Sequence, residues 1–153
     1  MLLLAALLAA QAANPQSETP RPRPMPVKAQ ATWSATTHEA AATPANQAWL
    51  KKGRAVTLTG EVIDLSCYLQ LGKKGEAHKA CGAKCVANGE PAGLLTKDGK
   101  VYMLLAEQHH PRRDGQVSLA TVMSGKMGET LTVSGMLMTN GKIPTLYVEA
   151  PAK

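Results

Sequence analysis

The chain has 153 residues, a formal net charge of +6 and 44% hydrophobic residues, which is enough for one domain of moderate size. The charge is spread evenly, because residues 13–53 carry five basic and two acidic groups and residues 54–153 carry twelve basic and nine acidic groups. Neither part has the dense basic patch of a nucleic-acid surface, so we do not expect a nucleic-acid partner.

Residues 1–13 have the features of a secretory signal peptide. An apolar run is followed by the small-residue pattern Ala10-Gln11-Ala12, which is typical of a cleavage site. The run is shorter than the roughly twenty apolar residues of a membrane span. We therefore expect a periplasmic or secreted protein of bacterial origin, with no transmembrane segment in the mature chain.

Residues 14–53 have the composition of a Pro/Ala-rich linker. Six of the ten prolines precede Gly53, which is the first of the thirteen glycines. Because proline fixes φ and removes an N–H donor, we expect an extended tether. Near its end, Thr43-Pro44 predicts the start of a short helix that ends at Gly53. Trp33 is the one residue that a tether does not need, and it is a candidate for docking on the domain that follows.

Residues 54–153 show the patterns of a small β domain. Val56, Leu58 and Val62 alternate with polar residues and predict the first strand, which Gly60 interrupts as a bend. The later elements follow in chain order: strands at 92–96 and 101–106, a helix at 117–127, and strands at 129–139 and 143–150. Asp98-Gly99 and Asn140-Gly141 predict the two hairpin turns that join strand pairs.

This order of elements resembles the OB-fold, a small five-stranded Greek-key barrel. The resemblance implies a mainly β fold with one helix, and with a cysteine-rich helical insert at residues 64–93 after the first strand. Four segments also resemble a group of exported bacterial proteins: Gly60-Glu-Val-Ile-Asp64, Cys67-Tyr-Leu, His78-x-x-Cys81 and Gly89-Glu-Pro-Ala-Gly93. That second resemblance implies no activity.

The insert contains all three cysteines and one of the four histidines of the chain. Their spacing, C-x10-H-x2-C-x3-C, puts Cys67, His78, Cys81 and Cys85 within nineteen residues. On a helix, the last three of these residues fall on one stripe, and Cys67 reaches across from the end of the first strand. Four such donors predict a tetrahedral Cys3His metal site. We expect the lysines of the insert to favour the thiolate forms.

Zinc is the first expectation for the metal ion, because a Cys3His site suits it. Copper(I) comes next, since it prefers thiolates, and Cys81-Gly-Ala-Lys-Cys85 is similar to the C-x3-C pair of exported copper chaperones that serve cytochrome oxidase. An iron–sulfur cluster is the third expectation. The methionines of the domain are expected to fill the core, because phenylalanine is absent. Gly82 is expected to allow the close approach of a strand.

Two functions of different classes follow from these patterns. The first is an exported metal-binding protein with a binding, carrier or assembly role and a protein partner in the periplasm. The alternative is a disulfide-stapled OB-like interaction module that binds a peptide, a glycan or a protein, with Cys67 paired to Cys81 or Cys85. An enzyme is not expected, because no Ser-His-Asp order, phosphate loop or carboxylate pair stands out. A thiol-redox enzyme would need a reactive cysteine of low pKa, for which Cys81 is the candidate.

Overall fold

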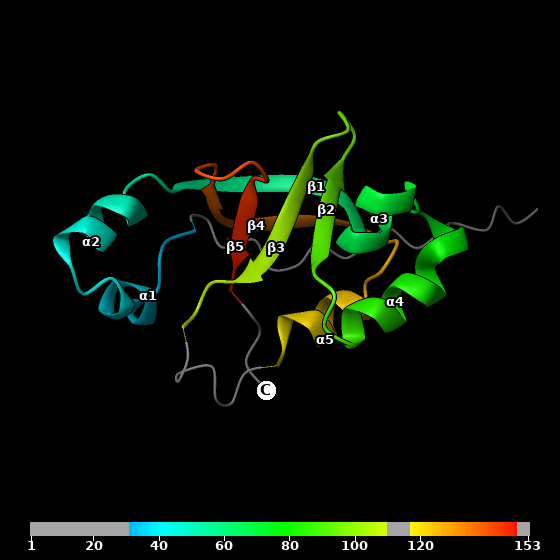
Figure 1. The fold of residues 1–153 in the computed structure, drawn as a ribbon, viewed down its shortest axis with the longest axis horizontal. Helices are drawn as coiled ribbons and strands as arrows, with labels where there is room; N and C mark the ends of the chain where they lie inside the picture. Colours follow the sequence, from blue (N-terminus) through cyan, green and yellow to red (C-terminus); the bar gives the residue numbers. More distant parts are fainter. Residues whose placement is uncertain (1–30, 110–116, 150–153) are drawn as a thin grey trace, which may run out of the picture.

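The computed structural model describes residues 31–109 and 117–149 (Figure 1). The expected signal peptide, the first part of the linker and most of the loop before residue 117 lie outside these ranges. Within them, no helix is both long enough and apolar enough to cross a membrane.

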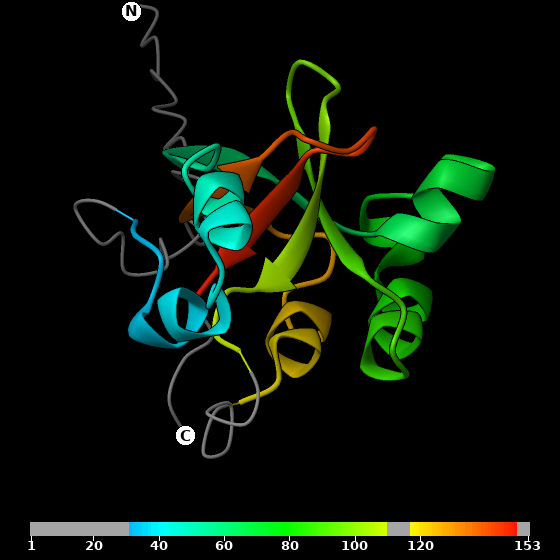
Figure 2. The same ribbon diagram turned by 60° about the vertical axis from the view of Figure 1, so that its left-hand side comes forward.

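Five strands close into a barrel in the order β1-β2-β3-β5-β4 (Figures 1 and 2). The strands are β1 (Arg54–Asp64), β2 (Ala92–Thr96), β3 (Val101–Ala106), β4 (Thr130–Met138) and β5 (Thr145–Val148). The pair β3 and β5 is parallel, and every other neighbouring pair is antiparallel. This topology confirms the predicted mainly β, OB-like barrel, including the hairpins between β2 and β3 and between β4 and β5.

The barrel interior is filled by side chains that alternate along the strands. The main cluster joins buried residues of all five strands with residues of two helices and the turn that follows: Val62, Leu94, Leu104, Leu131, Val133, Leu146, Val148, Val86, Met123 and Met127. Met136 and Met138 are also buried, at 7% and 9% exposure. The expectation that methionines fill the core is confirmed for these four methionines.

Two glycines lie where strands approach one another too closely for a side chain. A Cβ on Gly60 would lie 2.6 Å from the backbone oxygen of Leu95, and a Cβ on Gly135 would meet the backbone oxygen of Tyr147. Gly60 and the adjacent Glu61 are also the residues at which β1 pairs with β2 and β4 at once. The sequence predicts a bend at Gly60, and the close strand contact explains why a residue without a side chain is needed there.

Two short helices precede the barrel, α1 (Ala35–Ala40) and α2 (Pro44–Leu50). The predicted start of α2 is confirmed, since the Thr43 side chain accepts a hydrogen bond from the Asn46 N–H at 3.2 Å and Pro44 takes the first helical position. Helix α1 lies where extended chain was expected. It is capped by Ser34, whose hydroxyl accepts from the Thr37 N–H at 3.3 Å.

The segment around Trp33 is attached to the barrel. The Trp33 indole donates to the Leu50 carbonyl at 3.0 Å and meets the ring of Tyr147 edge-on, with centroids 5.5 Å apart. The buried Glu107 accepts a hydrogen bond from the Ser34 N–H at 2.7 Å. The expected docking of Trp33 is therefore present.

The remaining helices surround the other parts of the barrel. They are α3 (Leu65–Leu71), a single 3-10 turn (Glu76–His78), α4 (Lys79–Ala87) and α5 (Leu119–Ser124). Figure 1 places α3 and α4 at the end of the barrel opposite α1 and α2, with α5 below. Helix α5 is shorter than the predicted 117–127, but it still buries Met123 in the core.

Candidate metal centre

The junction of β1 and α3 positions the first two polar groups of the site. Asp64 is the last residue of β1 and the N-cap of α3, and its Oδ1 accepts a hydrogen bond from the Cys67 N–H at 3.2 Å. An aspartate at this position satisfies one of the free N–H groups that every helix start leaves. The cap therefore holds the carboxylate directly beneath the first turn of α3, from which the Cys67 side chain projects.

Helix α4 brings the third group. Gly82 is buried on α4, and a Cβ at this position would lie 3.2 Å from the Cβ of Asp64 and 3.1 Å from the Sδ of Met127. The missing side chain lets α4 lie directly against the end of β1, as was predicted for Gly82. Cys85, almost one turn further along α4, consequently faces Asp64 from the side opposite Cys67.

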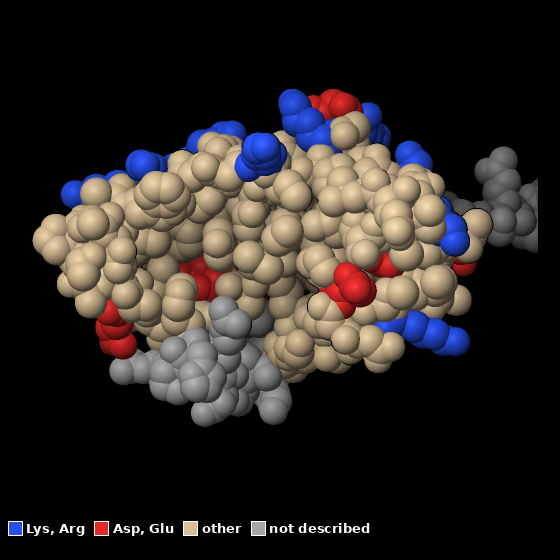
Figure 3. Space-filling view, in the orientation of Figure 1, with Lys and Arg blue, Asp and Glu red and all other residues tan. Residues whose placement is uncertain are grey.

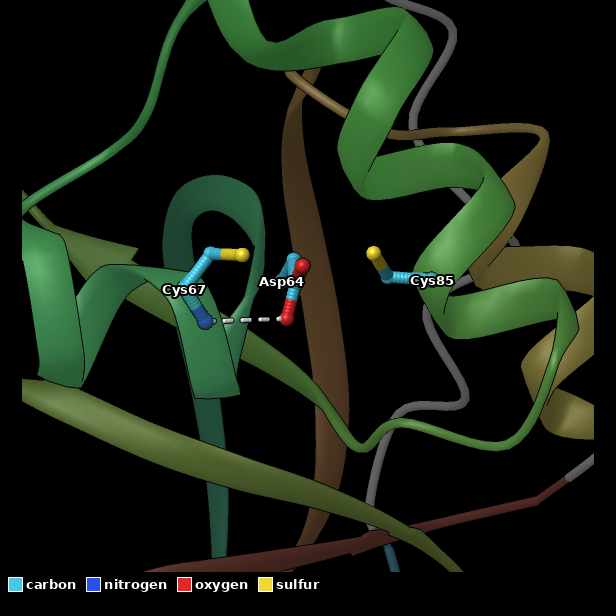
Figure 4. A group of neighbouring side chains, drawn as sticks. All are labelled: Asp64, Cys67 and Cys85. Carbon is cyan, nitrogen blue, oxygen red and sulfur yellow. Dashed lines mark hydrogen bonds between the residues drawn. The ribbon is translucent and has the colours of Figure 1, made fainter.

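Asp64, Cys67 and Cys85 form the group in which a carboxylate oxygen and two sulfurs all lie within 4.8 Å of one another. Figure 4 shows both sulfurs pointing towards the carboxylate, one from α3 and one from α4. The Asp64 side chain is fully buried, while both cysteines are partly exposed. Two sulfurs that bind one zinc ion lie about 3.8 Å apart, so only a small closure separates this arrangement from a coordination site.

His78 lies next to this group without belonging to it. Its Nε2 is 3.6 Å from Oδ2 of Asp64, and the residue is only 6% exposed. The pair is too long for a hydrogen bond, and both atoms are buried without a hydrogen-bond partner among the described residues.

Cys81 is exposed on α4, outside the 4.8 Å group. It is near enough to act electrostatically on the thiols of Cys67 and Cys85. Of the four predicted ligands, the structure thus brings two together, Cys67 and Cys85. It adds Asp64, which the predicted set lacked.

A sequence signal for Asp64 existed. An aspartate immediately before an apolar helical run is a helix N-cap pattern, and Asp64-Leu-Ser-Cys67 puts the first cysteine at the residue whose N–H the cap binds. That cap pattern predicts a carboxylate beside the cysteine, whereas the predicted metal set contains only thiolate and imidazole ligands.

Burial and the neighbouring Asp64 carboxylate raise the pKa of both thiols. The pKa of the Cys67 thiol is raised from 9.0, first by the neighbouring Asp64 carboxylate and then by burial. Burial raises the pKa of Cys85 to about 11, and the negative charge of Asp64 adds to the effect. Burial also raises the pKa of Asp64, but contacts with Cys67, Cys85 and His78 outweigh it and hold this pKa below its ordinary 3.8.

The expectation that nearby lysines favour thiolates is therefore wrong for these two cysteines. Lys73 does lower the pKa of Cys67, but its effect is smaller than those of Asp64, burial and Cys81. These upward shifts favour the protonated form of both thiols at neutral pH. Neither has the depressed pKa that a thiol-redox enzyme requires, while a bound metal ion would displace both protons.

All three cysteines are free in this structure. Since the sulfurs of Cys67 and Cys85 lie within 4.8 Å of one another, these two are nevertheless the pair that a modest rearrangement could join.

Comparison of the chain with protein-family models, with curated proteins and with solved structures gave no match. The functional argument therefore depends on the geometry of the site.

Proposed function

We propose that this chain is an exported metal-binding protein that holds one metal ion between α3 and α4, with a binding, carrier or assembly role. The observation that carries the proposal is the group formed by Asp64, Cys67 and Cys85, whose ligand atoms all lie within 4.8 Å. Zinc is the first candidate, because it accepts carboxylate oxygen as well as thiolate sulfur. Copper(I) is second, since it prefers sulfur alone, and an iron–sulfur cluster is third.

The partial exposure of Cys67 and Cys85 favours a carrier over a sealed structural ion, because an ion held there is accessible from the surface. A protein partner in the periplasm would then load or unload the ion. A nucleic-acid partner is disfavoured, since Figure 3 shows lysine and arginine side chains in separate groups along the upper and right-hand edges of the view, and not gathered in one patch.

The proposal is tested by elemental analysis, using plasma mass spectrometry on protein exported and purified without an affinity metal. One equivalent of metal is expected in the native chain, and Cys67→Ser and Cys85→Ser should each lose it. Ser66→Ala changes an exposed neighbour on the same helix and serves as the control. Metal-free native protein, with no uptake of zinc or copper(I) by the reduced chain, would refute the proposal.

The second candidate function is a disulfide-stapled interaction module. Two observations favour it: the proximity of the Cys67 and Cys85 sulfurs, and an open cleft of about 460 Å³ bordered by the residues before β2, the end of β3 and the start of α5. Mass spectrometry of the exported protein separates the two functions. A native Cys67–Cys85 disulfide and no metal would establish the module, whereas three alkylatable thiols in the chelator-treated protein would exclude it.

A further inference from the structure

We infer that the fourth ligand of this ion is Nε2 of His78, so that the centre is a zinc site of one aspartate, two cysteines and one histidine, from which Cys81 is excluded. The inference rests on the proposed function, because it assigns the ligands of the same site. It changes the predicted Cys3His set by exchanging Cys81 for Asp64.

Two buried polar atoms without a partner carry the inference. Oδ2 of Asp64 and Nε2 of His78 face one another at 3.6 Å, in side chains that are 0% and 8% exposed, and neither has a hydrogen-bond partner among the described residues. Buried polar atoms are almost always satisfied. When two such atoms face each other beyond hydrogen-bond length, a ligand that both of them bind is the simplest explanation.

Their separation matches that of two ligands on one ion. With metal–ligand bonds of about 2.1 Å, an oxygen and a nitrogen on a tetrahedral zinc ion lie about 3.4 Å apart. The observed 3.6 Å is within a few tenths of that value. A direct hydrogen bond would need a contraction to about 3.0 Å, so the observed spacing suits an ion better than it suits a direct bond.

The same carboxylate oxygen also faces the two thiols. Oδ1 is bonded to the Cys67 N–H, and Figure 4 draws Oδ2 between the sulfurs of Cys67 and Cys85. Because Oδ2 also faces His78, the Asp64 carboxylate lies next to both the cysteine pair and the imidazole. His78 lies outside the 4.8 Å group, so zinc binding requires the imidazole ring and the two sulfurs to move closer together around one ion.

Cys81 is the ligand that this arrangement leaves out. It is exposed, whereas His78 is buried against the carboxylate. Two thiolates, one carboxylate and one neutral imidazole give a centre of net charge −1 with a divalent ion, the same charge as a Cys3His centre. On binding, two thiol protons leave to solvent, and His78 binds through Nε2 while Nδ1 keeps its proton. Oxygen and imidazole donors favour zinc over copper(I).

The test is zinc X-ray absorption spectroscopy together with chelator competition, on the native chain, His78→Gln and Cys81→Ser. We expect two sulfur scatterers and imidazole scattering in the native protein. His78→Gln should lose the imidazole scattering and at least tenfold in zinc affinity, since even residues outside the ligand set cost ten- to a hundredfold. Cys81→Ser, the matched control, should keep both sulfurs and the native affinity.

Three sulfur scatterers in the native protein, falling to two in Cys81→Ser, would overturn the inference and restore the Cys3His set. Native spectra without imidazole scattering would also overturn it, and would make His78 a positioning residue for Asp64. If His78→Gln does not fold, the sulfur count in the native chain and in Cys81→Ser still decides. Absence of zinc from the native chain would instead refute the proposed function.

Discussion

Replacing Asp64 by asparagine should make the cysteines more reactive without unfolding the protein. Asparagine caps a helix as well as aspartate does, so the cap on Cys67 survives and the stability should change by less than about 1 kcal/mol. The negative charge beside both thiols disappears. The pKa of Cys85 is about 11 against an ordinary 9.0, with burial the first cause and Asp64 the next. Since burial remains, we expect this pKa to fall only part of the way.

Each unit by which the pKa falls raises the thiolate fraction at pH 8 about tenfold, because pH 8 lies below the thiol pKa in both proteins. The assay is the rate of iodoacetamide alkylation against pH, followed by mass spectrometry in a Cys81→Ser background that leaves only Cys67 and Cys85 as targets. Asp64→Asn should increase the rate about tenfold at pH 8.

Asp98→Asn provides the matched control for this experiment. Asp98 lies in the turn between β2 and β3, and its pKa is lowered to about 2, first by its hydrogen bond with Lys100. Its substitution removes the same unit of charge far from the thiols and should leave their alkylation unchanged. Equal rates in Asp64→Asn and the parent, or an equal acceleration in Asp98→Asn, would refute the account of the thiol pKa values.

Three further outcomes are expected. Zinc affinity should fall about 100-fold per pH unit between pH 8 and pH 7, because two thiol protons compete with the ion. A tenfold slope in chelator competition would mean that only one thiol binds. Gly60→Ala should lower the free energy of unfolding by roughly 1–3 kcal/mol, because its Cβ would overlap the backbone of β2; an unchanged urea midpoint would contradict this. Trp33→Ala should lower the free energy of unfolding by about 1–3 kcal/mol, because it loses the hydrogen bond to Leu50 and the ring contact with Tyr147. Trp49 is 51% exposed, so Trp49→Ala, the control, should lower the free energy of unfolding by less than about 1 kcal/mol.

The barrel could be predicted because its signals are local. Each signal depends on the backbone conformation of only a few neighbouring residues. These signals are the alternation along β1, the Asp98-Gly99 turn and the glycines where strands approach closely. Helix α1 could not be predicted in this way. Its short sequence, Ala35–Ala40, has no apolar period, and it is held by contacts with Glu107, which is about seventy residues away in the chain.

The site was predicted in part for a related reason. Helical spacing predicts that His78, Cys81 and Cys85 share one stripe, but it cannot say which direction each side chain takes in the folded chain. Cys81 and Cys85 share a stripe on α4, yet Cys81 is exposed and Cys85 is turned towards Asp64. That choice depends on how closely α4 approaches β1, which Gly82 and the buried Met127 determine together. The complete ligand set therefore stays a prediction, which the zinc spectra of the loaded protein would decide.

The packing of α3 and α4 against the barrel bears on whether the ion has a structural role or is carried and released. Val86 of α4 belongs to the main core with Met127, whereas Leu65 of α3 packs in a separate cluster with Ile63 and Leu95. Each of the two helices is thus attached to the barrel by its own buried apolar contacts, and the ion would lie between them. Removing it should change how α3 and α4 meet while the barrel stays folded. A protein whose fold survives the loss of its ion can release that ion and bind it again, and a carrier role requires that property.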